Sequence, residues 1–150
     1  MTGKKSITPD ARRVKPHHYE FLNTTGNIVL TTVKGPIDLA TVTSATQINI
    51  RCFKEIEQCN IGCIFVVENS MHITEEARSY YTQILQQHKA DLDKNIYVAY
   101  VAEPDVVDRA ASCALLKKIY GSVEIPFQSF TLLEDAMSWL NSVLKPELAG

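Results

Sequence analysis

Apolar residues are distributed along the chain in two patterns, and each pattern predicts one class of secondary structure. Two stretches, 63–69 (CIFVVEN) and 96–103 (IYVAYVAE), are almost continuously apolar and rich in β-branched and aromatic residues. Such runs are typical of strands that are covered on both faces of a sheet. Shorter strand-like stretches at 18–24, 27–35 and 125–130 complete a predicted sheet of five strands.

Between these stretches, apolar residues recur three and four positions apart, which is the period of an amphipathic helix. The pattern predicts four helices, at 39–58, from about 74, at 104–121 and at 131–144. Pro104 suits a first helical turn, and Thr131 with Glu134 has the spacing of a capping box. The last helix carries Leu133 on its apolar stripe. The predicted N-caps of the first two helices are Asp38 and Thr74.

The order of these elements predicts an α/β fold. Turn residues at 25–27 (TGN) lie between the first two strands, so we expect an N-terminal antiparallel hairpin. The later strands alternate with helices, which is typical of parallel crossover units. We therefore predict a mixed β-sheet with this hairpin and four helices. These elements form a single domain over 17–150, preceded by a flexible basic tail over 1–16.

Charge is distributed unevenly along the 150 residues. Residues 1–16 carry five of the 15 basic residues and one of the 17 acidic residues, so 17–150 carry 10 basic and 16 acidic residues, a net charge of −6. Nucleic-acid affinity depends largely on basic residues that displace counterions from phosphates. The acidic body therefore argues against nucleic acid as a partner. The basic tail is either a solvated terminus or a segment that contacts an acidic surface.

The sequence contains no signal for a membrane or for secretion. No apolar run reaches the roughly 20 residues that cross a bilayer, and the basic N-terminus is not followed by the apolar segment of a signal peptide. We therefore expect a cytoplasmic protein without a membrane span. Cys59 and Cys63 lack the spacing of a zinc or redox pair, so we expect reduced thiols and no metal site.

Signals for catalysis and for cofactor binding are weak. The chain has six glycines and no glycine-rich phosphate loop. Carboxylates lie at all four predicted helix starts, where an incoming anion would meet like charge. We therefore expect no cofactor. Because no nucleophile motif is present, an enzyme is the less favoured class; its active site would be dispersed around His72.

Three stretches of the sequence resemble STAS domains, the sulfate-transporter and anti-sigma-factor-antagonist family. VLTTVKGPIDLATVTSAT (29–46) is similar to their strand, G-x-[IL]-D turn and helix, and CIFVVEN takes the place of their buried third strand. FQSFTLLEDAMSWL (127–140) is similar to the closing strand and helix of SpoIIAA-like bacterial proteins. The resemblance covers roughly residues 19–144. It implies a regulatory or binding module rather than a catalyst, whose partner is a protein or a small apolar ligand.

The resemblance also directs attention to the turn after the third strand. STAS domains can be switched there by phosphorylation of a Ser or Thr in a D-S-x-G-type sequence. In VVENSMHITEEA (66–77), Ser70 and Thr74 are the candidates for phosphorylation, but the D-S pair and its glycine are absent. Glutamates nearby would repel a phosphate, and Thr74 has the alternative role of N-cap, which we favour.

The same turn lies at the carboxyl end of a central strand, where open α/β sheets bind ligands. We predict a ligand-binding or partner-binding site there, formed by Ser70, Met71, His72, Ile73, Tyr81, Val106 and Val107. The alternative is that the apolar members, together with Tyr80, pack in the core. A homodimer is compatible with the exposed edge of such a sheet.

Overall fold

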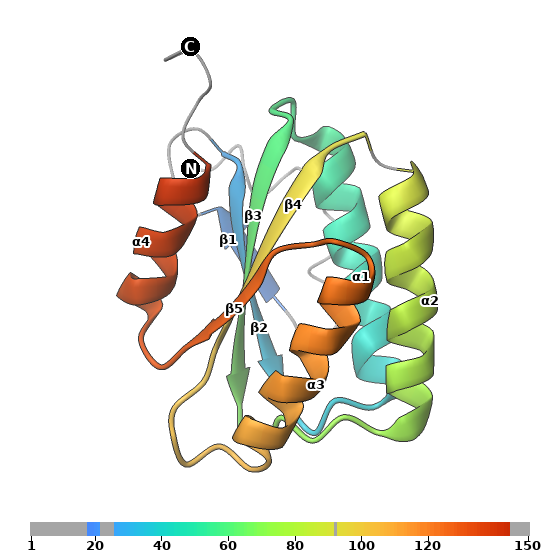
Figure 1. Cartoon of the computed structure of the whole chain (residues 1–150), viewed down its shortest axis with the longest axis vertical. Helices are drawn as coiled ribbons and strands as arrows, with labels where there is room; N and C mark the ends of the chain where they lie inside the picture. The colour runs from blue at the N-terminus through green and yellow to red at the C-terminus, as the bar shows by residue number, and fades with distance from the viewer. Residues whose placement is uncertain (1–17, 22–25, 92, 145–150) are drawn as a thin grey trace.

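Nine helices and strands form the part of the chain that the computed structural model describes, residues 18–21, 26–91 and 93–144 (Figure 1). The strands are β1 (His18–Phe21), β2 (Ile28–Lys34), β3 (Asn60–Glu68), β4 (Asn95–Val101) and β5 (Phe127–Phe130). The helices are α1 (Leu39–Glu55), α2 (Glu75–Asp91), α3 (Arg109–Ser122) and α4 (Leu133–Val143). The predicted basic tail over 1–16 lies outside the described residues, as does 22–25 between β1 and β2.

The five strands form one sheet in the order β1-β2-β3-β4-β5. Strands β2 to β5 run parallel, with Leu30 opposite Ile64 and Ile64 opposite Ala99. The short strand β1 pairs antiparallel with β2, with His18 opposite Thr32. Because parallel strands alternate with helices from β2 onward, the predicted α/β class is confirmed.

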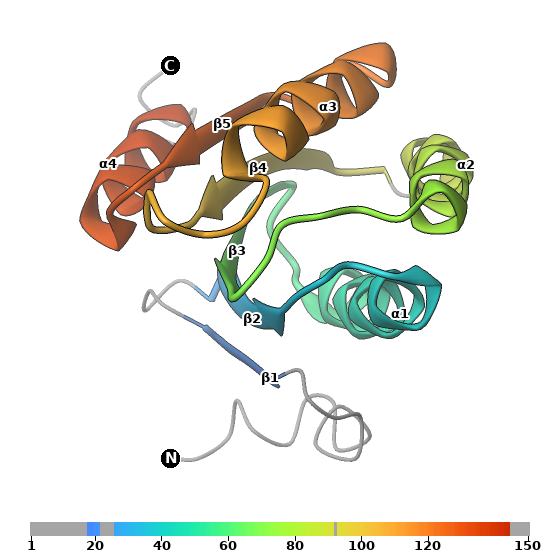
Figure 2. The ribbon, with the colours of Figure 1, turned by 90° about the horizontal axis from the view of Figure 1, so that it is seen from below.

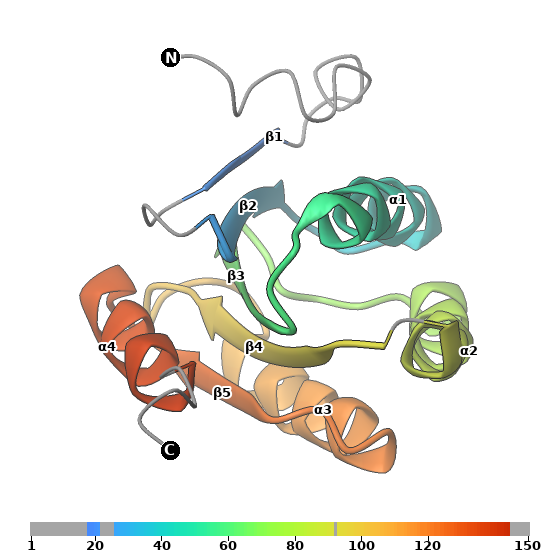
Figure 3. The same cartoon turned by 90° about the horizontal axis from the view of Figure 1, so that it is seen from above.

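Three helices cover one face of the sheet and one helix covers the other. From β3 onward, each strand is added on the same side of the preceding strand, and crossover connections between parallel strands share one handedness. Helices α1, α2 and α3 therefore lie together on one face, whereas α4 follows the last strand and packs on the opposite face (Figure 2, Figure 3).

Strand β3 contributes to both hydrophobic cores, as expected of a central strand. Cys63, Phe65 and Val67 belong to the core formed with α1, α2 and α3, and Ile64 belongs to the core under α4. Alternate side chains of a strand point to opposite faces, so both faces of β3 need apolar residues. The prediction that the continuous apolar run forms a doubly covered strand is confirmed.

Helix α4 packs close to the sheet because Gly62 of β3 has no side chain. A Cβ atom at this position would lie 3.1 Å from Leu140 Cδ1, tighter than ordinary van der Waals contact. Leu140 and Ala136 are both fully buried in the contact between α4 and the sheet. A larger residue at position 62 would therefore push the helix away from β3.

Two of the predicted helix starts are confirmed by capping hydrogen bonds. Asp38 Oδ1 accepts a hydrogen bond from Thr41 N (2.8 Å) at the start of α1. Thr74 Oγ1 accepts one from Ala77 N (3.2 Å) at the start of α2. Each side chain thus satisfies a backbone donor that the helix itself leaves unpaired.

The other two predicted helix starts are wrong. Helix α3 begins at Arg109, five residues after Pro104, because the backbone of Val107 pairs with the turn after β3 instead of continuing a helix. The predicted capping box also fails to form. Thr131 Oγ1 accepts a hydrogen bond from Arg109 Nη2 (3.3 Å), and Leu132 precedes α4 without a side-chain cap.

The boundary between α1 and β3 also differs from the prediction. The first helix is predicted to reach 58 and the third strand to begin at 63, whereas α1 already ends at Glu55 and β3 begins at Asn60. Gly62 N donates to Asn27 O (2.8 Å), and Asn95 Nδ2 donates to Asn60 Oδ1 (2.8 Å). These bonds to the neighbouring strands extend β3 by three residues at its amino end.

Candidate functional site

The turn after β3, residues 69–74, is fixed by backbone hydrogen bonds to the loops that follow β2 and β4. On one side, Ile37 N donates to His72 O (2.7 Å) and Thr74 N donates to Ile37 O (3.1 Å). On the other side, Met71 N donates to Val107 O (2.8 Å). Three loops at the carboxyl end of the sheet, the lower end in Figure 1, are therefore held together as one unit.

Gly35 and Asn69 allow these loops to approach each other closely. Asn69 has a left-handed backbone conformation (φ 74°), which Asn adopts more readily than most residues, and its Nδ2 donates to Gly35 O (2.9 Å). A Cβ atom at Gly35 would lie 1.6 Å from the carbonyl oxygen of Ser70. The turn can take this position only when residue 35 is glycine.

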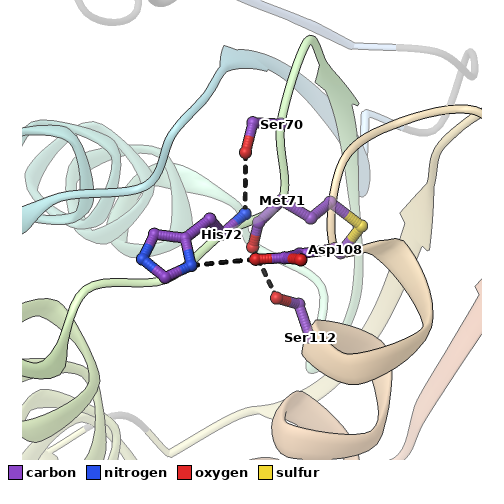
Figure 4. A network of polar contacts seen from close by, with 5 residues as sticks. All are labelled: Ser70, Met71, His72, Asp108 and Ser112. Carbon is purple, nitrogen blue, oxygen red and sulfur yellow. Dashed lines mark hydrogen bonds and ion pairs between the residues drawn. The ribbon is translucent and has the colours of Figure 1, made fainter.

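Two buried serines complete the turn (Figure 4). Ser70 Oγ accepts a hydrogen bond from His72 N (3.0 Å), and Ser112 Oγ of α3 donates to Met71 O (2.6 Å). Ser70 is only 8% exposed, so it would have to leave this position before a kinase could modify it. The other phosphorylation candidate, Thr74, uses its hydroxyl to cap α2.

His72 and Asp108 form an exposed pair between the turn and the start of α3 (Figure 4). His72 Nδ1 lies 2.9 Å from Asp108 Oδ2, and the two side chains are 56% and 48% exposed. Asp108 occupies the N-cap position of α3 in a left-handed conformation (φ 59°) without a capping bond. Exposed pairs contribute about 0–1 kcal/mol. The contact therefore orients the imidazole ring more than it stabilises the fold.

Some of the predicted site residues are buried in the core and others are exposed to solvent. Three apolar members are buried in the core beneath the turn: Met71, Ile73 and Tyr81. These three residues follow the core-packing alternative, and two further apolar residues, Tyr80 and Val106, are partly buried against the same core. The exposed members beside the turn are His72 and Val107.

Exposed large apolar side chains gather at the same end of the sheet. Among the described residues they are Leu39, Val107, Leu132 and Leu133. Each follows the carboxyl end of β2, β4 or β5, either in a loop or at a helix start. Leu133 belongs to the last helix as predicted, and it is 40% exposed because α4 begins at this residue, beside the loop.

A groove of about 610 Å³ lies among the segments that end β3 and β4 and precede α4. Its apolar lining comes from Val66, Val67, Val101, Val106, Leu132 and Leu133. Its charged lining among the described residues is acidic: Glu68, Glu103 and Asp105. Pockets of several hundred Å³ accommodate small molecules, and α/β sheets bind ligands at this end of their strands.

The groove could not be predicted from the sequence, although two acidic residues at strand ends mark part of it. Glu68 and Glu103 each stand at or next to the end of a continuous apolar run, and so mark two adjacent strand ends. Leu132 and Leu133 give no comparable signal. They join the groove only because β5 lies next to β4 in the folded sheet.

The His72 imidazole has no nucleophile as its partner among the residues that the structure describes. A catalytic serine or cysteine would have to contact the base that activates it. Within the described part of the chain, the only side chain in hydrogen-bond contact with the His72 ring is Asp108. The described residues contain no group of three or more His, Cys, Asp or Glu side chains that could hold a metal ion. None of the described helices is long and apolar enough to cross a membrane.

Comparison with known proteins identifies a fold but no family. The sequence matches no protein-family model and no curated protein. Among solved structures, it is similar to an ATP citrate lyase mutant from Methanosaeta concilii in complex with (3S)-citryl-CoA, with a TM-score of 0.55 and 10% identity. The match covers 97% of this chain and 44% of that chain, so this chain spans less than half the length of that protein. At this identity the likeness shows the α/β fold alone.

Proposed function

We propose that the chain is a cytoplasmic, STAS-like binding module without catalytic activity, which docks a protein partner at the carboxyl end of its sheet. Its family resemblance is supported by the order of elements, an antiparallel pair of strands followed by alternating helices and strands. The proposed site lies beside the turn that STAS domains use for regulation. This chain keeps the position of that turn and replaces its phosphorylation sequence.

The observation that carries the proposal is the exposure of apolar side chains around one preorganised groove. Leu132 and Leu133 line the groove, and Val107 follows its lining residue Val106. Exposed apolar surface rimmed by polar residues is typical of interaction sites, and its removal from water favours binding by about 25 cal/mol per Å². Backbone hydrogen bonds already fix the turn after β3, so docking orders little of this chain.

Charge around the groove defines the chemistry of the partner. Glu68, Glu103 and Asp105 line it, and no Lys or Arg appears among the described lining residues. Arg109 lies nearby, but its Nε donates to Ala102 O (2.9 Å) within the protein. Carboxylates beside apolar side chains are complemented by a segment of another protein that combines apolar residues with Lys or Arg.

Affinity capture from the protein's native cells tests this proposal with three variants. Val107→Ser/Leu132→Ser removes apolar surface at the groove, and Glu68→Gln/Glu103→Gln removes its charge. The control, Glu55→Gln/Glu57→Gln, makes the same change at exposed positions near the end of α1. We expect a protein that the wild type and the control capture, and that both groove variants lose.

Two properties make the test specific: the dependence of capture on salt and the sequence of the captured protein. Rim charge pairs are screened by salt, so we expect capture to weaken as ionic strength rises. The captured protein should contain a segment in which basic residues flank apolar ones. Equal capture by the wild type and by folded groove variants contradicts the proposal, and so does the capture of no protein at all.

A second candidate is an enzyme with a dispersed active site at the same turn. The His72–Asp108 contact favours it, because a carboxylate that orients an imidazole is a common arrangement of a general base. A substrate screen on the wild type and on His72→Ala distinguishes the candidates. Activity that a folded His72→Ala variant loses would favour the enzyme, and activity that this variant retains would exclude His72 as the base.

A further inference from the structure

A cavity of about 60 Å³ lies inside the core, between the sheet and the helices on the face opposite to α4. Helices α1, α2 and α3 arch around this face of the sheet (Figure 2). One water molecule needs roughly 10–15 Å³ of such volume. The cavity therefore has room for several water-sized groups, and it is a different site from the acidic groove.

Three tyrosine hydroxyl groups meet at the wall of this cavity. Tyr81 OH of α2 lies 2.5 Å from Tyr100 OH of β4 and also contacts Tyr120 OH of α3. The three residues line the cavity and are 5%, 4% and 2% exposed, respectively. Three elements of the fold thus bring three polar groups together at one part of the cavity wall.

The three hydroxyl groups can satisfy one another. Tyr81 OH contacts both other hydroxyls, and a side-chain hydrogen bond also joins Tyr100 and Tyr120. Each O–H can therefore donate to the next hydroxyl, and the cluster forms a polar part of the cavity wall that is complete without an occupant.

The amide of Asn49 provides a second polar group at the cavity. This residue of α1 is 4% exposed and lines the cavity. Its Oδ1 accepts a hydrogen bond from Thr31 Oγ1 (3.2 Å), and the described residues supply no acceptor for its Nδ2. A buried donor without a partner costs about 1–3 kcal/mol, and an acceptor located in the cavity would remove this cost.

The remaining wall disfavours a charged occupant. Most of it is apolar, including Val42, Ala45, Phe53, Leu85, Val98 and Ile125. The ammonium group of Lys94 is held by the carbonyl oxygens of Ile56 and Gln58. Burial raises the pKa of the Cys63 thiol far above its ordinary value, so this group stays neutral. A cation placed here would lose its hydration and find no carboxylate among the described lining residues, and an anion would have only the ammonium group of Lys94, which already holds two carbonyl oxygens.

We infer that this cavity is a binding site for a small neutral molecule that combines an apolar body with a hydrogen-bond acceptor, such as a ketone, ester or amide carbonyl. The carbonyl oxygen accepts a hydrogen bond from Asn49 Nδ2, and the apolar body contacts the aliphatic wall. The site goes beyond protein docking at the groove. Ligand binding in the cavity and protein docking at the groove are tested separately, and the failure of one test leaves the other unaffected.

Two probes of nearly equal shape test this inference on the full chain. Cyclopentanone carries a carbonyl oxygen, and methylenecyclopentane carries a CH₂ group in its place. Each probe is titrated into isotope-labelled protein and followed by NMR. We expect cyclopentanone to shift the signals of Val42, Ala45 and Val98, and to bind roughly three- to tenfold more tightly than the hydrocarbon because of its hydrogen bond.

Matched variants locate the site. Ala45→Leu fills the cavity and should abolish binding of both probes. Ala114→Leu adds the same atoms at an exposed position of α3 and should leave binding unchanged. The inference is overturned if neither probe shifts cavity signals up to its solubility limit, if both bind equally, or if folded Ala45→Leu still binds. The wild-type comparison decides the question even if Ala45→Leu does not fold.

Discussion

Gly35 links the end of β2 to the turn after β3, and replacing it by alanine tests how that turn is held. The new Cβ would lie 1.6 Å from Ser70 O, whereas real Cβ atoms stay beyond about 3.0 Å. The two segments must therefore separate by more than an ångström. Two hydrogen bonds span this contact, Gly35 N to Glu68 O and Asn69 Nδ2 to Gly35 O, each 2.9 Å long.

The expected magnitude of Gly35→Ala follows from these contacts. Two hydrogen bonds at about 0.5–1.5 kcal/mol each, together with the displaced turn, should lower the free energy of unfolding by about 2–4 kcal/mol. Urea unfolding measures the change. Gly121→Ala is the matched control: its Cβ meets nothing within 4 Å inside α3, so it should raise stability by about 0.5–1 kcal/mol. Equal stability of Gly35→Ala and the wild type would refute this account of the turn.

Two further predictions concern a helix cap and buried ionisable groups. Thr74→Ala should lower the free energy of unfolding by about 1 kcal/mol because α2 loses its N-cap. Thr82→Ala, at a half-buried position within α2, removes a hydroxyl that donates to Arg78 O of the same helix and should change the free energy of unfolding little. Equal effects of the two variants in urea unfolding would argue against the cap. Burial raises the pKa of Tyr81 to about 12, so the folded state favours the neutral phenol. The contribution of the neutral phenol to the free energy of unfolding is fully present below about pH 10. It is lost as the pH rises towards 12, by about 1.4 kcal/mol per pH unit for each such group. A free energy of unfolding that stays unchanged between about pH 9 and 11 would contradict this effect of burial.

Much of the fold could be predicted from local patterns. The apolar run at 63–67 alternates between two cores, so its continuity was sufficient to identify a central strand. Asp38 and Thr74 cap their helices through bonds to residues three positions later, and such short-range contacts depend on little beyond the local sequence. These features are predictable because the interactions that produce them are close in the chain.

The features that could not be predicted depend on contacts between distant segments. Helix α3 begins late because Val107 pairs with Met71, 36 residues earlier, and this contact overrides the helix signal at Pro104. The tyrosine cluster joins residues from three elements that no periodic pattern relates. The groove likewise requires Leu132 and Leu133 to lie beside the ends of β3 and β4. The position of the turn is therefore predictable from the sequence, whereas the surface around it depends on the fold.

The measurement that tests the docking surface most directly is amide hydrogen exchange of the protein with and without the partner that it captures. Docking at the groove predicts slower exchange upon binding in 69–72, 103–108 and 131–133, the segments around the carboxyl ends of the strands. Exchange at the opposite end, in 56–60 and 93–95, should stay unchanged. Protection confined to that opposite end, or unchanged exchange around the groove in the complex, would contradict the proposed docking surface.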